Sequence, residues 1–485
     1  MPDLSLFTLG LTIYVVAVTA FIVSENRRPQ SAFAWLFLLI TVPVAGLVIY
    51  VLFGRMRGGV GRTRRLLKQS LPGHFATTLA PLLGEHERGL ERLALTDGPS
   101  ARLANLVSAS SPAVLTTSNR VEVLQDASSA YPRLFADIED ARETVHLQFY
   151  IWRPDALGER LRSLLARKVR EGVEVRLLYD PVGSIGFLGI PMLVYRRRMR
   201  RAGIDMRPTA PLWRVHTISY RDHRKIAVID GRVGYTGGLN MGAEHLDPGR
   251  GFARWRDTHL RMEGLAVRAL QAVFAIDWAN ATHGPLLGPE HFPPLEGGFD
   301  GAHLPVQLVT SGPDSDWRAV RQQYFGMVTA ARRRVRVQTP YFVIEDSITE
   351  ALKAAALSGV DVSLMITLRE PGHRFVHWAA RTYFADVAAA GVEVLLYDGG
   401  FLHAKTVVVD GEVASVGSGN WDIRSFSINY ELNALIHDRG IARELEAAFE
   451  RDRALCVRFD PEAYREGPRL PRFRDSAARL VSPLL

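Results

Sequence analysis

The chain begins with two strongly apolar stretches. Neither Leu4–Ser24 nor Ala32–Phe53 contains a charged side chain. At about 1.5 Å of rise per residue, each is long enough to cross a hydrocarbon core of roughly 30 Å as a helix. The polar segment Glu25–Ser31 between them is too short to form a domain. The pattern therefore predicts a two-helix transmembrane hairpin, in which Pro43 is tolerated inside the second helix.

Basic residues are unevenly placed around these stretches. Arg27 and Arg28 lie in the short connection, whereas six basic residues follow the second stretch: Arg55, Arg57, Arg62, Arg64, Arg65 and Lys68. Because basic loops stay in the cytoplasm, we expect the rest of the chain there. The same basic segment either lies against an anionic leaflet or acts only as a solvated linker. A cleaved signal peptide is not expected, because no basic segment precedes the first stretch.

Beyond the apolar start, a series of β-rich runs and helical segments occurs twice. Three runs of the first copy match the second: Val145–Trp152 with Val335–Phe342, Gly172–Tyr179 with Gly359–Ile366, and Gly203–Met206 with Gly391–Val394. Repeats of this size indicate a duplicated domain, because the repeats of a solenoid are much shorter. Helical segments such as Leu157–Arg170 and Ser347–Ala356 alternate with the runs. We therefore expect two homologous α/β sandwich halves, each with a largely buried sheet.

The Pro- and Gly-rich residues from about 282 to 304 predict a linker between the halves. The tail after Pro461 is rich in Arg and Pro and either lies along a membrane or forms an ordinary ordered tail. The expected organisation is a membrane hairpin over 1–54, a basic connector over 55–115, a first half over 116–284, a second half over 305–460 and a tail over 461–485.

The amino-acid composition indicates the class of protein and the charge of the molecules that it binds. The chain has 485 residues, of which 47% are hydrophobic and 23% charged, as in a folded protein of more than one domain. Its net charge of +8 suits an anionic partner, whether membrane phosphate, nucleic acid or an acidic substrate. The single cysteine, Cys456, excludes an intrachain disulfide and a thiolate metal cluster.

One motif occurs in both halves. His223-Arg-Lys225-Ile-Ala-Val-Ile-Asp230 is matched by His403-Ala-Lys405-Thr-Val-Val-Val-Asp410. A glycine turn and an asparagine follow each copy, with Asn240 after Gly237-Gly238 and Asn420 after Gly417-Ser418-Gly419. The chain has only five lysines, and two of them are Lys225 and Lys405. Lysine kept at matching positions in an arginine-rich chain indicates a need for a compact ammonium group.

These residue types in this spacing suit phosphoryl transfer. In a strand, His and Lys two positions apart project from the same face, and the apolar run behind them can anchor the strand in the core. Two halves related by a pseudo-twofold axis would bring both pairs to one phosphate. The lysines and asparagines would then neutralise its oxygens. One histidine can attack phosphorus, while the other protonates the leaving oxygen and later deprotonates the incoming alcohol.

The paired His-x-Lys-x4-Asp motifs resemble the phospholipase D superfamily, and with the apolar start nearly the whole chain resembles its bacterial cardiolipin synthases. The resemblance implies an integral, multi-pass protein of the bacterial inner membrane that uses phosphatidylglycerol and anionic lipids. It implies no metal, no other cofactor and no nucleic acid, and it leaves a homo-oligomer open. It also implies that His223 is the nucleophile and His403 the acid/base, although the sequence alone does not distinguish these roles.

The candidate catalytic residues are therefore His223, Lys225, Asp230, His403, Lys405 and Asp410, supported by Asn240, Asn420, Asp257, Glu431 and Ser418. A reactive imidazole needs a carboxylate on its other nitrogen, and the resemblance assigns Asp257 to His223 and Glu431 to His403. Asp230 and Asp410 are expected to anchor the following turn through backbone amides rather than to touch substrate. Ser418 either donates a hydrogen bond or is purely structural. Asp222 stands where the family pattern has asparagine.

By this resemblance, the expected reaction moves a phosphatidyl group from one phosphatidylglycerol to another and releases glycerol, giving cardiolipin. A phospholipase D or another transphosphatidylase would use the same chemistry with water or another alcohol as acceptor. A nuclease would have no evident use for two membrane segments. A non-catalytic lipid-binding scaffold would be expected to lose at least one motif histidine or lysine, and both copies are complete.

Overall fold

The computed structural model describes most of the chain. The described residues are 2–25, 29–50, 72–95, 98–184, 190–210, 219–246, 254–282, 284, 286, 288, 290–294, 303–368 and 374–481. The basic segment Arg55–Lys68 and the arginines of the first connection, on which the expected orientation rests, lie outside them. Part of the predicted linker lies outside them as well.

The first half is built on a seven-stranded sheet. Its strands are β2 (Asn119–Gln125), β3 (Thr144–Phe149), β4 (Glu174–Tyr179), β5 (Asp205–Pro208), β6 (Lys225–Ile229), β7 (Val233–Gly237) and β9 (Thr258–Gly264). They lie in the order β2-β9-β7-β6-β3-β4-β5. Strands β3, β4 and β5 are parallel, and β6 runs antiparallel to β3. The motif strand β6 is therefore central, with neighbours on both sides.

The second half repeats this sheet. Its strands are β10 (Val306–Ser311), β11 (Arg334–Thr339), β13 (Asp361–Thr367), β14 (Glu393–Tyr397), β16 (Thr406–Val409), β17 (Val413–Gly417) and β19 (Glu431–Ile436). Two edge strands, β1 (Leu115–Thr116) and β20 (Cys456–Arg458), extend the order to β1-β10-β19-β17-β16-β11-β13-β14-β20. The seven consecutive strands from β10 to β14 in this order correspond one by one to the seven strands of the first sheet. This correspondence confirms the predicted duplication.

Helices cover the outer faces of both sheets. In the first half these are α7 (Ala127–Glu139), α8 (Ala156–Arg170), α9 (Pro181–Ser184) and α10 (Ile190–Arg201). In the second half they are α12 (Ala319–Ala330), α13 (Asp346–Leu357) and α14 (Arg374–Ala388), with the short α15 (Ile423–Ser427) near the site. The apolar spacing of α8 buries Leu157, Leu161 and Leu165 against the sheet.

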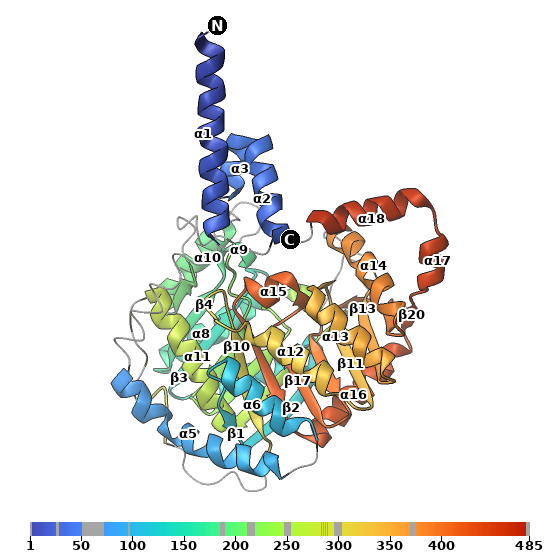
Figure 1. The fold of residues 1–485 in the computed structure, drawn as a ribbon. Coiled ribbons are helices and arrows are strands. Elements are labelled where there is room, and N and C mark those ends of the chain that lie inside the picture. Colours follow the sequence, from blue (N-terminus) through green and yellow to red (C-terminus); the bar gives the residue numbers. More distant parts are fainter. Residues whose placement is uncertain are drawn as a thin grey trace.

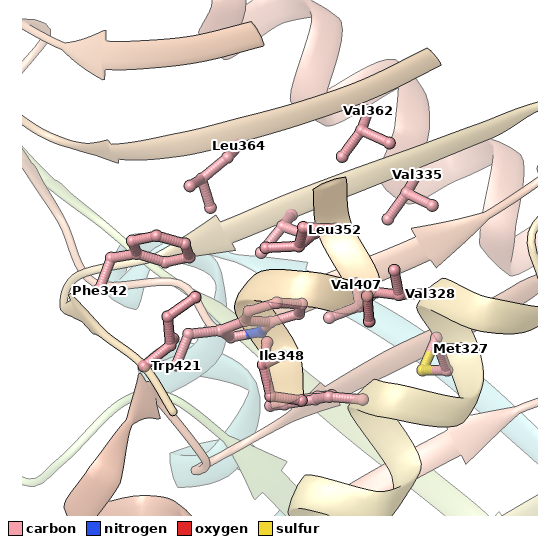
Figure 2. Packing of buried hydrophobic residues seen from close by; sticks show 14 of the residues in the cluster. Met327, Val328, Val335, Phe342, Ile348, Leu352, Val362, Leu364, Val407 and Trp421 are labelled. Carbon is pink, nitrogen blue, oxygen red and sulfur yellow. The ribbon is translucent and has the colours of Figure 1, made fainter. Parts of the chain in front are cut away.

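The core of the second half illustrates this packing (Figure 2). Ile348 and Leu352 of α13 face Val335 and Leu364 of the sheet, and all four are buried. Trp421 lies beside the ring of Phe342, with ring centroids 6.4 Å apart. Strand β18 (Trp421–Asp422), which carries this tryptophan, pairs with β12 (Phe342–Val343) just beyond the second motif.

The inner faces of the two sheets share one core. Ile226 and Val228 of the first motif strand belong to the same buried cluster as Val408 of the second. Helices α11 (Leu265–Thr282) and α16 (Arg439–Arg453) contribute to this cluster. The two halves therefore pack as one body around a pseudo-twofold axis, and the motif strands approach each other at their starts.

Where the structure describes them, the expected connector and tail are largely helical. Helices α5 (Pro72–Ala94) and α6 (Ser100–Ser110) lead into β1, which pairs with β10 of the second sheet. The tail forms α17 (Pro461–Glu466) and α18 (Arg469–Val481). Arg479 of α18 donates to Asp386 of α14 at 2.8 Å, so the tail packs on the second half.

At the amino terminus, α1 (Pro2–Ser24) projects away from the body, with α2 (Pro29–Thr41) and α3 (Pro43–Ile49) beside it (Figure 1). The single second helix expected over Ala32–Phe53 is instead two helices, because Pro43 has no N–H to continue α2. Within the part of the chain that the structure describes, no helix combines the length and the hydrophobicity needed to cross a membrane.

Candidate active site

Both His–Lys pairs lie at the beginning of their motif strands. Lys225 is the first residue of β6, and Lys405 immediately precedes β16. All four side chains are buried, the two lysines almost completely. Charge–charge effects link the pairs: Lys405 lowers the pKa of both Lys225 and His223, and His223 lowers that of His403. The structure thus brings both copies of the motif into one site, as the sequence predicts.

The two halves exchange backbone hydrogen bonds at the motifs. The N–H of His223 donates to the carbonyl of Tyr430 at 2.9 Å, and the N–H of His403 donates to that of Arg256 at 2.7 Å. Strand β15 (Phe401–Leu402) pairs in parallel with β8 (Trp255–Arg256), and Asp222 forms an isolated bridge with Tyr430. Arg256 and Tyr430 directly precede the buried acids Asp257 and Glu431. Each of these two residues therefore lies beside the motif of the other half.

This crossing decides which carboxylate serves which histidine. Nδ1 of His223 lies 3.0 Å from Oε2 of Glu431, and Nδ1 of His403 lies 2.6 Å from Oδ2 of Asp257. The expected pairs, Asp257 with His223 and Glu431 with His403, are therefore wrong. Both acids belong to the site, but each lies in the half opposite to its histidine, because the backbone pairing places it there.

Glu431 is held by its own neighbours as well. Its Oε2 accepts from Oγ of Ser418 at 2.5 Å, and its Oε1 accepts from Oγ of Ser425 at 2.8 Å. Of the two roles considered for Ser418, the structure supports the hydrogen-bond donor, with the buried carboxylate as acceptor. Burial raises the pKa of Glu431, but His223 and Lys225 outweigh it, and the pKa is lowered. Glu431 is therefore a carboxylate that can orient an imidazole.

The equivalent position in the first half must be glycine. A Cβ on Gly238 would come 1.9 Å from Oδ1 of Asp257. Asp257 is shorter than Glu431, and its carboxylate occupies the space that corresponds to the side chain of Ser418 in the second half. Oδ1 of Asp257 also accepts from the N–H of Thr258 at 2.8 Å. The two copies of the site are thus related but not identical.

Each motif lysine is hydrogen-bonded to the backbone of the histidine in its own motif. Nζ of Lys225 donates to the backbone carbonyl of His223 at 2.6 Å, and Lys405 donates to that of His403. Burial, with the charge of the other lysine, lowers the pKa of Lys225 to about 7. Burial also lowers the pKa of Lys405, to about 8. An anionic phosphate would favour the protonated form of both lysines.

Burial also lowers the pKa of His223 and His403, and the nearby lysines add to the effect. Both imidazoles are therefore neutral in the empty site at neutral pH. With Nδ1 donating to a carboxylate, Nε2 of a neutral histidine carries a lone pair. The arrangement supplies a nucleophile and a proton carrier.

Asp230 and Asp410 do not reach the histidines. The carboxylate of Asp230 accepts 2.8 Å hydrogen bonds from the N–H groups of Arg142, Glu143 and Thr144 at the start of β3. Asp410 holds the equivalent amides of 332–334 at 2.8–2.9 Å. Both have positive φ, near 50°. Whether either aspartate also takes part in catalysis stays a prediction. The alternative role in backbone anchoring is correct, although the amides belong to the neighbouring strand rather than to the following turn.

The asparagines are buried near the motifs but differ from each other. Oδ1 of Asn240 accepts from the N–H of Ile151 at 3.2 Å, so this oxygen supports the backbone. Oδ1 of Asn420 is buried and has no hydrogen-bond partner among the described groups. A phosphate contact by either side chain therefore stays a prediction.

Asp222, where asparagine was expected, behaves as a neutral group. Its Oδ2 accepts from Nε2 of Gln148 at 2.7 Å. Burial, with the charges of Asp277 and Asp180, raises its pKa to about 8. A protonated aspartic acid has the shape of an asparagine side chain and can donate and accept like one. The departure from the family pattern therefore leaves the local chemistry amide-like at neutral pH.

Three aromatic residues that sequence reasoning did not select lie against the histidines. The rings of Tyr150 and His223 lie edge to face with their centroids 4.8 Å apart, and the ring centroids of Trp255 and His403 are 5.2 Å apart. His245 is buried, with its ring centroid 6.4 Å from that of His403, and burial lowers the pKa of His245 to about 3. No motif or spacing in the sequence marks any of these three residues.

One group of described side chains has metal-ligand geometry, and it lies apart from the motif residues. His146, Glu174 and His291 place one ligand atom each within 4.8 Å of the others. However, the guanidinium of Arg176 pairs with Glu174 and lies 3.3 Å from Nε2 of His291. A positive group already occupies this position, and it would oppose a cation.

Comparisons with known proteins agree with this geometry. The sequence pattern of the family described as "Cardiolipin synthase, PLD-like domain" matches residues 134–250 and 324–453, one segment in each half. A second pattern, "Phospholipase_D-nuclease N-terminal", matches residues 10–55. The solved phosphatidylserine synthase of Haemophilus influenzae superposes with a TM-score of 0.62 at 14% identity, covering 80% of this chain and 100% of that chain. At this identity, the likeness concerns the fold.

Full-length relatives are more similar in sequence. The major cardiolipin synthase of Bacillus subtilis is 38% identical over 99% of this chain and 98% of its own length. The cardiolipin synthase of Geobacillus kaustophilus is 39% identical over 99% of this chain and 94% of its own length. With both motif copies present and joined in one site, the chain belongs to the cardiolipin synthase family of phospholipase D-like enzymes.

Proposed function

We propose that this enzyme is a cardiolipin synthase that transfers a phosphatidyl group from one phosphatidylglycerol to another through a phosphohistidine. The observation that carries the proposal is the convergence of two histidines, each oriented by a carboxylate of the opposite half, with two buried lysines. A hydrolase and a transferase share this arrangement. The sequence relatives favour the transferase.

In the first step, Nε2 of His223 attacks phosphorus of the donor lipid and forms the N–P bond. The bond between phosphorus and the headgroup glycerol oxygen breaks. His403, which takes up a proton on Nε2 when the anionic phosphate binds, gives that proton to the leaving oxygen. Lys225 and Lys405 balance the charge that develops on the non-bridging oxygens. Free glycerol leaves, and His403 is left neutral.

In the second step, a headgroup hydroxyl of a second phosphatidylglycerol gives its proton to His403. Its oxygen attacks phosphorus as the N–P bond breaks. Cardiolipin is released, and His223 returns to its starting state. The roles of His223 as nucleophile and His403 as proton carrier are assigned from the resemblance to the family.

The lipid substrates imply a membrane location. We infer that the amino-terminal helices insert into the bacterial cell membrane and hold the catalytic body at its cytoplasmic face. The support is the uncharged composition of Leu4–Ser24 and 32–50, together with the projection of α1 from the body (Figure 1). Tethering keeps the site in contact with both substrates, which never leave the bilayer.

The deciding experiment uses the purified protein in detergent with phosphatidylglycerol alone and EDTA, and follows lipids and glycerol by mass spectrometry. We expect cardiolipin and glycerol in equal amounts, and neither product with His223→Ala or His403→Ala. Phosphatidic acid as the main product would show that water takes the phosphatidyl group and that the enzyme is a phospholipase D. A covalent lipid on the peptide that contains His223 would identify the nucleophile. The same adduct on His403 would reverse the assigned roles.

A further inference from the structure

The carboxyl-terminal helix α18 packs on α14 through one of its faces. Asp475 and Ala478 lie on this face and are buried. Near the end of the helix, Arg479 donates to Oδ2 of Asp386 at 2.8 Å, and its guanidinium carbon lies 4.4 Å from the ring centroid of Tyr383. Both of these partners belong to α14. The helix is therefore docked through polar and cation–π contacts as well as through packing.

Asp475 is at the centre of the docked face. Its carboxylate accepts from Arg474 at 2.7 Å and from the hydroxyl of Tyr464 at 3.3 Å, and Nε of Arg381 lies 3.5 Å from it. The guanidinium of Arg474 in turn lies 4.4 Å from the ring centroid of Trp378. These contacts fix which side of α18 faces the protein and which side faces outward.

The outward side of α18 is apolar. Leu470, Phe473 and Leu480 are 78%, 73% and 83% exposed, and Ala477 is exposed as well. Their spacing of three, four and three positions places the four side chains on one face of the helix. An amphipathic helix of a globular protein normally turns such a stripe toward the core. Here the stripe faces away from the protein, which indicates a partner outside it.

The charges beside this stripe indicate the kind of partner. Helix α18 carries four arginines, and its one acid is the buried Asp475. Arg469 and Arg472 are exposed next to the apolar side chains. A second copy of the chain would bring the same positive surface to the contact, and like charges repel. An anionic lipid surface offers phosphates to the arginines and acyl chains to the stripe.

The position of α18 in the molecule agrees with a lipid surface. Figure 1 shows α18 at the end of the body from which α1 projects, whereas α5 lies at the opposite end. Phe33 and Phe37 of α2, at the same end as α18, are also exposed. Apolar side chains from the two ends of the sequence are therefore exposed at one end of the molecule.

We propose that α18 is an interfacial helix that lies along an anionic lipid leaflet, with Leu470, Phe473 and Leu480 among the acyl chains and Arg469 and Arg472 at the lipid phosphates. The inference rests on the proposed membrane function and names the partner of the carboxyl-terminal helix. It requires no segment of the chain to cross the bilayer. Because the opposite face of α18 is docked on α14, this contact would orient the second half of the catalytic body against its lipid substrates.

The test uses the full-length protein in lipid nanodiscs, in which both faces of the bilayer are open to solvent. In a Cys456→Ser background, Phe473→Cys or Leu480→Cys carries the fluorophore NBD on the outward face of α18. Leu95→Cys, exposed just after α5, is the matched control at the opposite end of the molecule. The bilayer contains phosphatidylcholine brominated in its acyl chains, with or without anionic phosphatidylserine. Bromine quenches NBD among the acyl chains, and iodide quenches it in water.

With phosphatidylserine, we expect blue-shifted emission, quenching by bromine and severalfold weaker quenching by iodide at positions 473 and 480, and none of these changes at 95. Iodide quenching at 473 and 480 equal to that at 95 would overturn the proposal. Protection from iodide without quenching by bromine would overturn it as well, because a protein, such as a second copy, would then cover the stripe. Equal lipid contact without phosphatidylserine would overturn the anionic preference.

The arginines are tested in the same nanodiscs. Arg469→Gln with Arg472→Gln should weaken the quenching by bromine at position 473 when phosphatidylserine is present. Arg88→Gln with Arg92→Gln, on α5, removes the same charge far from α18 and should have no effect. Equal effects of the two double variants would show that only net charge matters and would overturn the placement of Arg469 and Arg472 at the phosphates.

The lipid contact and the proposed function can fail separately. The quenching measurement requires no turnover, whereas cardiolipin formation by the unlabelled protein is measured with phosphatidylglycerol in detergent. Lipid contact at positions 473 and 480 without cardiolipin formation would count against the proposed function and support the contact made by α18. Cardiolipin formation without lipid contact at these positions would overturn the inference on α18 and leave the proposed function standing.

Discussion

His223 and Glu431 are 208 positions apart in the chain, yet Nδ1 of the histidine lies 3.0 Å from Oε2 of the acid. The equivalent contact joins His403 to Asp257. Each half of the duplicated body therefore contains one reactive histidine. The carboxylate that orients this histidine comes from the other half. Neither half contains a complete pair, so the reaction depends on how the two halves pack.

The crossed pairing predicts which substitutions are coupled. In a double-mutant cycle, His223→Gln and Glu431→Gln should be non-additive in unfolding free energy by about 1–3 kcal/mol, because they remove one buried contact. His223→Gln with Asp257→Asn should be closer to additive. Thermal unfolding of the single and double variants measures both cycles. A larger coupling between His223 and Asp257 would contradict the crossed arrangement.

The buried lysines predict opposite effects of pH on activity and stability. Their folded-state pKa values, about 7 and about 8, lie below the value of about 10.4 expected in an unfolded chain. Above pH 7 the unfolded chain therefore binds more protons, and stability contributed by Lys225 and Lys405 rises with pH up to about 10. Over the same range the free enzyme loses its ammonium groups, so kcat/KM should fall.

Initial rates and thermal unfolding between pH 6 and about 9.5 test this relationship. Lys225→Met provides the control: it should flatten the rise in stability with pH and reduce activity at every pH. A kcat/KM that increases steadily through pH 8 would contradict the requirement for protonated lysines.

Asp222→Asn should be tolerated. The folded pKa of about 8 lies above the usual value for aspartate, so the folded state binds the extra proton between about pH 4 and pH 8. Stability contributed by Asp222 is present at low pH and is lost as the pH rises through this range. Asparagine keeps the polar shape without the titration, so the variant should have a higher Tm at pH 8 and near-normal activity. A loss of activity of tenfold or more would indicate that the carboxyl proton takes part in catalysis.

Asp230→Ala and Asp410→Ala should affect folding rather than chemistry. Each removes three backbone hydrogen bonds to a carboxylate, at a cost of about 2–4 kcal/mol. We expect a lower Tm but cardiolipin formation at low temperature. His223→Ala, by contrast, should form no cardiolipin at any temperature at which it is folded. Complete inactivity of folded Asp230→Ala would return this aspartate to the catalytic residues.

Much of the fold could be predicted from local patterns. The matching runs at Val145–Trp152 and Val335–Phe342 became β3 and β11, and the expected helices became α8 and α13 within one residue at each end. Strand and helix periodicity depends on residues close in the chain, so it can be read without knowing the partners. The break at Pro43 is also a local feature, because proline cannot continue the hydrogen-bond ladder of α2.

The sequence by itself determined that two His–Lys pairs exist and that each begins an apolar strand. The resemblance to the family added Asp257 and Glu431. Only the tertiary structure decided that each acid serves the other half. The reason is the backbone pairing between halves, where His223 binds the carbonyl of Tyr430 and His403 that of Arg256. A repeat reveals what each half contains. Which acid contacts which histidine depends on the backbone segments that pair across the pseudo-twofold axis. The spacing of residues within one half does not predict that contact.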